Sequence, residues 1–172
     1  MSTTISLKAL NELPKDEFVF ELGGIFEHSP WVPETVAGDR PFLTIRELHE
    51  AMISAIEKAG IEAQLKLIRA HPELAGKAAV RGELTEESTH EQAGAGLDKC
   101  TPEEFEKLTR LNADYNAKFG FPFILAVRGY DRHGIIAEFE RRYGLNVEQE
   151  RAESLSQIYK IGGFRLNDLI KV

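Results

Sequence analysis

The sequence contains a single cysteine and no excess or cluster of positive charge, and each absence excludes a class of protein. Its one cysteine, Cys100, excludes an internal disulfide and is typical of a protein kept in a reducing compartment. The 172 residues carry a net charge of −7 without a cluster of Lys and Arg, so the basic face that nucleic-acid-binding proteins use is not expected. An anionic small molecule is still compatible with this charge, because the local field of a pocket decides what binds there.

Long apolar runs are also missing. No stretch approaches the roughly 18 apolar residues of a membrane-spanning helix, and the N-terminal residues lack the basic-then-apolar order of a secretory signal. The terminal Leu-Ile-Lys-Val is not the Ser-Lys-Leu address of peroxisomal proteins. We therefore expect a cytoplasmic protein without a membrane partner, and its length favours one domain over residues 1–172.

Helical periodicity dominates what is present. Thr44 and Thr101 each begin a Thr-x-x-Glu capping box, and Pro102 stands at the first helical position of the second one. Apolar residues at helical spacing also predict a helix, interrupted by a Gly-Gly pair, that contains Phe18, Leu22, Ile25 and Phe26. The run FPFILAV is either a buried strand or a buried extended segment. The sequence thus predicts an all-α fold, a single-domain bundle of about eight helices.

Residues able to do chemistry gather between positions 69 and 97. Pro72 disfavours helical backbone at His71, which predicts that this histidine lies at the exit of a helix. Histidine is the usual acid or base at neutral pH, but it is also common in structural turns. The residues alone leave both interpretations of His71 open.

A line of polar residues follows on the next predicted helix. Ser88, Glu91 and Gln92 fall at i, i+3 and i+4 and therefore share one side. They can form the wall of a pocket for a small polar ligand, although a solvated helix face is the simpler interpretation. Arg128 ends the apolar run, where a cation serves either as a clamp for an anionic ligand or in a structural salt bridge.

Metal and nucleophile signatures fail in detail. His90 and Glu91 begin the zinc pattern His-Glu-x-x-His, but Gly94 stands where the second histidine is required. Cys100 precedes a predicted helix N-terminus, which lowers a thiol pKa, yet it lies in a polar connection and is interpreted as a spectator. The sequence therefore predicts no metal site.

Three motifs in this order resemble one enzyme family. The chain reads HPELAGKAA, then LTEESTHEQAGAGL, then LNADYNAKFGFPFILAVRG, with IFEHSPWV near its start and FRLNDLI near its end. These segments resemble the decarboxylases of 2-oxo-4-hydroxy-4-carboxy-5-ureidoimidazoline (OHCU), and the resemblance covers essentially the whole chain. It implies an all-α fold, a homodimer, and a carboxy-lyase that converts OHCU to (S)-allantoin in urate degradation without a cofactor. It also implies fusion to, or association with, another urate-pathway enzyme as an expected arrangement.

The resemblance assigns roles one residue at a time. It implies catalytic roles for His71, Glu91 and Arg128. It implies substrate contacts for Pro72, Ser88, Gln92, Ile124, Leu125, Ala126 and Val127. Two departures from the family pattern are Glu73, where aspartate is common, and Gly162-Gly163, which replaces a bulkier pair. Without the resemblance, a non-enzymatic helical interaction module and a lyase or hydrolase of another ureide remain alternatives.

Overall fold

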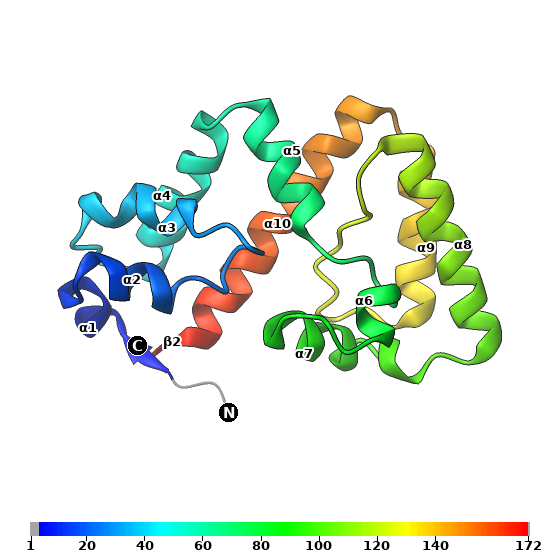
Figure 1. The fold of residues 1–172 in the computed structure, drawn as a ribbon, viewed down its shortest axis with the longest axis horizontal. Helices are drawn as coiled ribbons and strands as arrows, with labels where there is room; N and C mark the ends of the chain where they lie inside the picture. Colours follow the sequence, from blue (N-terminus) through cyan, green and yellow to red (C-terminus); the bar gives the residue numbers. More distant parts are fainter. Residues whose placement is uncertain (1–3, 172) are drawn as a thin grey trace. The chain divides into compact units, whose positions relative to one another are not determined.

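The computed structural model describes residues 4–171, except the side chains of residues 77 and 78, and helices make up most of them. The α-helices are α1 (Leu7–Glu12), α2 (Lys15–Glu21), α3 (Trp31–Val36), α4 (Ile45–Lys58), α5 (Ile61–Ala70), α6 (Lys77–Val80), α7 (Glu86–Gly94), α8 (Pro102–Phe119), α9 (Arg132–Tyr143) and α10 (Val147–Leu169). Two short 3-10 helices, η1 (Ala37–Asp39) and η2 (Leu97–Lys99), and two short strands, β1 (Ile5–Ser6) and β2 (Ile170–Lys171), complete the fold. The all-α prediction is confirmed (Figure 1).

The two capping signals predicted from the sequence, at Thr44 and Thr101, begin helices as predicted. The Thr44 hydroxyl accepts the amide of Glu47 at the start of α4. At the start of α8, Thr101 and Glu104 accept each other's backbone amides, which is the complete capping box. Gly120 ends α8 with a φ of 77°, a left-handed conformation that glycine adopts without steric cost. Local hydrogen bonding therefore fixes where the longest helix of the 71–158 region begins and ends.

Two compact units share the chain. Unit 1 contains both ends of the described chain, up to Ala70 and from Tyr159 onward, and unit 2 runs from His71 to Ile158. In unit 1 the terminal strands pair in parallel, with Ile5 opposite Ile170. The expectation of one domain over residues 1–172 stays a prediction.

An ion pair joins the segments IFEHSPWV and FRLNDLI inside unit 1. Arg165 donates to the Gly24 carbonyl and to the Glu27 carboxylate, each at 2.9 Å, and both charged side chains are buried. Nearby, a Cβ at Gly162 would lie 2.8 Å from the Phe26 ring, so glycine is needed for this close approach. The segments IFEHSPWV and FRLNDLI therefore contribute to the packing of unit 1.

Aromatic side chains form the core of unit 2, where α8 and α9 pack side by side (Figure 1). Tyr115 of α8 makes an edge contact with Phe123 at a centroid distance of 5.3 Å, and Phe123 stacks on Phe139 of α9 at 3.8 Å. The run FPFILAV, residues 121–127, is buried throughout and is neither helix nor strand. Of the two alternatives that the sequence allowed, a buried strand or a buried extended segment, the structure has the extended segment.

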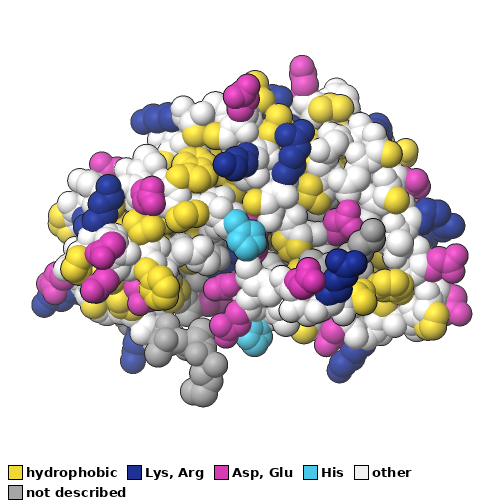
Figure 2. Space-filling view, viewed as in Figure 1, with side chains coloured by type: hydrophobic (Ala, Val, Ile, Leu, Met, Phe, Trp, Pro, Cys, Tyr) yellow, Lys and Arg dark blue, Asp and Glu magenta, His cyan; other side chains and the backbone are white. Residues whose placement is uncertain are grey.

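The sequence predicts that no basic face is present, and the surface view agrees with this for the face that it draws. On the face drawn in Figure 2, Lys and Arg side chains are interspersed with Asp and Glu. Within residues 4–171, every helix is too short or too polar to cross a lipid bilayer.

Candidate functional site

His71 occupies the helix exit that the sequence predicted. Helix α5 ends at Ala70, and the His71 side chain is 7% exposed, with its Nε2 atom fully buried. Proline at the next position explains why the helix stops there, because its ring disfavours helical backbone in the residue before it. The histidine is therefore fixed by backbone geometry on one side and by burial on the other.

The loop that follows His71 is tightly turned. Ala75 has a φ of 52°, which is the left-handed region that residues with a side chain seldom adopt. Gly76 allows the turn, since a Cβ there would lie 2.7 Å from the Cβ of Glu73. Strained backbone of this kind persists only where the surrounding structure holds it, and it is concentrated at functional sites.

Helix α7 directs its polar line inward. The Thr85 hydroxyl caps the helix by accepting the Ser88 amide at 3.1 Å. Ser88 and Gln92 are 4% and 5% exposed, and Glu91 between them is half-buried. The interpretation of this side as a solvated face is therefore wrong for Ser88 and Gln92, because they pack against the rest of unit 2.

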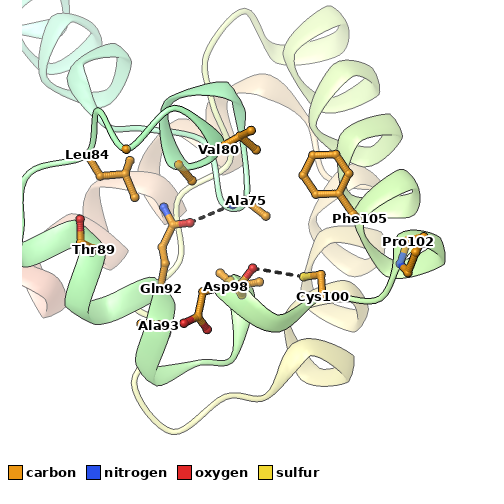
Figure 3. Close-up of a pocket in the computed structure, with 13 residues that line it drawn as sticks. Ala75, Val80, Leu84, Thr89, Gln92, Ala93, Asp98, Cys100, Pro102 and Phe105 are labelled. Carbon is orange, nitrogen blue, oxygen red and sulfur yellow. Dashed lines mark hydrogen bonds between the residues drawn. The ribbon is translucent and has the colours of Figure 1, made fainter.

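Gln92 joins α7 to the loop after His71. Its Oε1 accepts the Ala75 amide at 2.9 Å (Figure 3). Its Nε2 donates to the Glu73 carbonyl at 3.3 Å. Both functional atoms of this carboxamide are thus used by the backbone of the loop. Two parts of the predicted site, the His-Pro loop and the polar line of α7, are in direct contact.

A mainly apolar pocket of about 510 Å³ lies beside this contact, and Gln92 is the predicted site residue that lines it. Its other lining residues include Ala75, Leu84, Cys100 and Phe105 (Figure 3). The Cys100 thiol donates to the Leu97 carbonyl at 3.3 Å, and partial burial raises its pKa. A raised pKa leaves little thiolate at neutral pH, which supports the interpretation of Cys100 as a spectator.

The segment carrying Ile124 to Val127 is held by residues that sequence reasoning missed. Gln157 of α10 accepts the Ala126 amide at 3.0 Å, and Arg142 of α9 donates to the Ile124 carbonyl. Arg142 in turn is paired with Glu150, which also accepts the Tyr115 hydroxyl. Burial raises the pKa of that hydroxyl, so Tyr115 remains a donor in this cluster.

A periodic signal for Arg142 was present in the sequence. Ile135, Phe139 and Arg142 fall at i, i+4 and i+7, and all three are buried on one side of α9. An arginine on an apolar stripe indicates a buried ion pair. For Gln157 no such signal distinguished a backbone-binding glutamine from a surface one.

All the predicted site residues belong to unit 2. His71 and Pro72 lie in the loop after α5, while Ser88, Glu91 and Gln92 lie on α7. Ile124 to Val127 form the buried segment, and Arg128 emerges exposed at its end, before Gly129 with a φ of 89°. The meeting of His71, Glu91 and Arg128 in one cavity stays a prediction.

The residues that the structure describes offer no metal centre. No three His, Cys, Asp or Glu side chains among them are grouped as ligands would be. His90, the first residue of the incomplete zinc pattern, is exposed on α7. The arrangement in unit 2 is instead one of a buried histidine in a loop that Gln92 of α7 contacts.

Comparison with known proteins gives one consistent result. A family model described as OHCU decarboxylase matches residues 11–167. The chain is 41% identical to the 2-oxo-4-hydroxy-4-carboxy-5-ureidoimidazoline decarboxylase of Haloferax volcanii, over 94% of each chain. It is 39% identical to the uric acid degradation bifunctional protein of Bacillus sp. (strain TB-90), covering 96% of this chain and 32% of that protein.

Solved structures agree with the sequence relatives. The crystal structure of an (S)-allantoin synthase matches with a TM-score of 0.79 and 32% identity. That match covers 96% of this chain and 54% of the other, so the chain spans about half of that protein. A crystal structure of an OHCU decarboxylase in the presence of (S)-allantoin shares the fold, with a TM-score of 0.68 and 20% identity.

Proposed function

Because the chain belongs to the OHCU decarboxylase family, we propose that it converts OHCU to (S)-allantoin in urate degradation. The observation that carries this proposal is the match to a relative named for this decarboxylation over 94% of both chains. The placement of a buried histidine beside an inward-facing polar helix supports it, because this reaction requires a positioned proton donor and acceptor.

The substrate itself can hold the electrons that the reaction releases. OHCU carries its carboxylate and a hydroxyl on one ring carbon, beside the ring C=N bond of an imidazoline. When the bond to the carboxylate breaks, CO2 leaves and the electron pair moves into the ring, where the nitrogen of the C=N bond takes a proton. The resulting enol then loses its hydroxyl proton and gains a proton on the neighbouring carbon, which becomes the stereocentre. This balance needs proton transfers alone, and we therefore propose a reaction without a cofactor.

Each residue of the proposed site has a role in these steps. His71 is the acid and base that removes the hydroxyl proton or returns a proton to one face of the ring. Glu91 holds the substrate hydroxyl or favours the charged form of His71, as a nearby carboxylate does. Arg128 pairs with anionic oxygen.

The remaining residues hold the substrate in place. Pro72, Ser88 and Gln92 contact the ring and the ureido group. Backbone groups of residues 124–127 other than the Ile124 carbonyl and the Ala126 amide, which bond to Arg142 and Gln157, bind the ring amides. In uncatalysed decay OHCU gives racemic allantoin, so fixed orientation is what the enzyme adds.

We also propose that the protein is a cytoplasmic homodimer. Each subunit binds the small-molecule substrate. Association with another urate-pathway enzyme is part of this proposal, because a Bacillus relative is a bifunctional uric acid degradation protein. Its support is the family resemblance together with the exposed apolar side chains of the described surface.

The test is to add the protein to freshly generated OHCU. We expect accelerated ultraviolet decay of OHCU and a circular dichroism signal of (S)-allantoin. Replacing His71 with Asn should lower turnover by at least about 10²-fold, the usual contribution of a general acid or base, with helicity unchanged. The matched control is His133→Asn, since His133 is exposed on α9 and outside the proposed site. Racemic product at the uncatalysed rate from the wild type would refute the function, and a fully active H71N would refute the role of His71.

A further inference from the structure

Two asparagines on α8 contact the loop that carries His71. Asn112 donates to the Leu74 carbonyl at 2.9 Å and is 2% exposed. Asn116 donates to the Glu73 carboxylate at 2.6 Å. The two lie four residues apart and therefore on the same side of the helix, so that α8 presents a pair of amide donors to this loop.

The loop is held from a second direction by α7. Gln92 accepts the Ala75 amide and donates to the Glu73 carbonyl. Glu73, Leu74 and Ala75 are thus each bonded to a side-chain amide from another element. Three consecutive residues fixed in this way explain how the left-handed backbone of Ala75 is maintained.

The bonding of Asn112 is incomplete, which argues that it was not selected for stability alone. Among the described residues, its Oδ1 atom is buried and has no hydrogen-bond partner. A buried polar atom left without a partner costs stability, whereas an apolar side chain of the same shape would avoid that cost. What the asparagine supplies in exchange is a donor aimed at the Leu74 carbonyl, three residues after His71.

We propose that Asn112 and Asn116 are positioning residues that set the place of His71 by holding Leu74 and Glu73. The proposal rests on the proposed function, in which His71 transfers the proton. Displacement of a catalytic group by about 1 Å can lower the rate by about 10²-fold, so side chains that never touch the substrate can control turnover. In this proposal the role of the Glu73 carboxylate is to accept the hydrogen bond from Asn116 and so hold the loop.

An exchange of donor and acceptor tests the Asn116 contact. The substitution N116D places a second carboxylate against Glu73, and we expect kcat to fall about tenfold or more with a smaller change in KM. Adding E73Q restores a hydrogen bond with its polarity reversed, and kcat should return to within about threefold of wild type. A purely structural role would not give rescue of kcat by this second substitution.

The Asn112 contact is tested by N112L, which removes the donor and fills the same space. We expect kcat to fall about tenfold with little change in the melting temperature, because removal of the unpartnered Oδ1 offsets the loss of the donor to the Leu74 carbonyl. A residue that only stabilises the fold would show the reverse, a lower melting temperature with unchanged kcat. The matched control is N167L, since Asn167 is exposed on α10 in unit 1 and donates to the Gly163 carbonyl one turn earlier, at 2.9 Å.

Hydrogen exchange of residues 71–76 separates this proposal from the proposed function. Without substrate, exchange should accelerate in N116D and return to the wild-type rate in N116D with E73Q. If wild-type protein does not turn over OHCU, the proposed function fails and the exchange rates alone decide whether α8 holds the loop. Unchanged exchange in N116D, faster exchange with full kcat, or failure of E73Q to rescue would each overturn the proposal.

Discussion

Arg142 is a completely buried cation whose guanidinium bonds to three other groups. It donates to Glu150, to the Ile124 carbonyl and, at 3.4 Å, to the Ser154 hydroxyl. Its charged plane also lies 4.3 Å from the centre of the Phe123 ring. One side chain thus joins α9, α10 and the buried segment before Arg128, and its charge serves the packing of unit 2.

Removal of this cation should be strongly destabilising. The substitution R142M leaves the Glu150 carboxylate buried without its counter-charge, and we expect a loss of about 3–5 kcal/mol in the free energy of unfolding. The neighbouring R141M is the matched control, because Arg141 is half exposed and pairs with Glu138 on the surface, where such pairs contribute about 0–1 kcal/mol. Urea unfolding of both variants gives the comparison, and equal losses would contradict the structural role of Arg142.

The position of a residue could be predicted from sequence where a local backbone restriction determines it. It could not be predicted where only packing against another element determines it. Pro72 fixed the exit position of His71, and the structure places His71 directly after α5. The inward direction of Ser88 and Gln92 could not be deduced, because a polar line on a helix looks the same whether it faces water or a protein interior. The loop contacts of Asn112 and Asn116 depend on a neighbouring element, and no local pattern encodes them.

Helix α10 continues through the Gly162-Gly163 pair without interruption. Elsewhere a glycine pair did end a predicted helix, since α2 stops at Glu21 and the residues from Leu22 to His28 form turns. Glycine weakens a helix by about 1 kcal/mol relative to alanine, so tertiary contacts must compensate in α10. The compensating contacts are those of the Phe26 ring with Gly162 and of the His49 ring with Gly163.

Filling this space should destabilise unit 1. In G162A the new Cβ would lie 2.8 Å from the Phe26 ring, and the cost of overpacking, about 1–3 kcal/mol, exceeds the gain of about 1 kcal/mol in helix propensity. The matched control is G94A in α7, where a Cβ would contact nothing within 4 Å and should be neutral or stabilising. Thermal unfolding would contradict this account if G162A proved more stable than the wild type.

Helices with caps were the elements best predicted from sequence. The helix starts at Thr44 and Thr101 are confirmed because both ends of each bond lie within four residues. At Thr44, however, the Glu47 carboxylate accepts the Leu43 amide, so the complete capping box forms at Thr101 and not at Thr44. By contrast, Phe18, Leu22, Ile25 and Phe26 are all buried although only Phe18 lies in a helix. Burial in turns can imitate helical spacing, which is why the predicted helix was too long.

At the scale of the whole molecule, exposed apolar side chains accompany the proposed homodimer. Phe20 and Leu43 of unit 1 are 82% and 81% exposed, and such residues are typical of what subunit interfaces bury. The order of the motifs identified the family from the sequence, since that order depends on the whole chain. The division into two units was not predictable, because it depends on contacts between the two ends of the chain.

The mass in solution tests the homodimer. Light scattering after gel filtration should give twice the 19.3 kDa of one chain over a tenfold range of protein concentration. A mass of one chain across that range would exclude a stable dimer. F20S with L43S, compared with the surface change E50S, then tests whether these two apolar residues contribute to association.

Unit 1 is built from two segments that are far apart in the sequence, and this has a consequence for folding during synthesis on the ribosome. The first 70 residues form this unit together with the last turns of α10 and β2. Strand β2 pairs with β1 near the start of the sequence. Translation produces these partners only after every residue from His71 to Ile158 has been made. The unit that holds the proposed site can thus fold earlier in translation, whereas the N-terminal helices must wait until residues 159–171 have left the ribosome. Binding by a general chaperone such as a ribosome-associated holdase would accordingly be concentrated on the first 70 residues of the nascent chain.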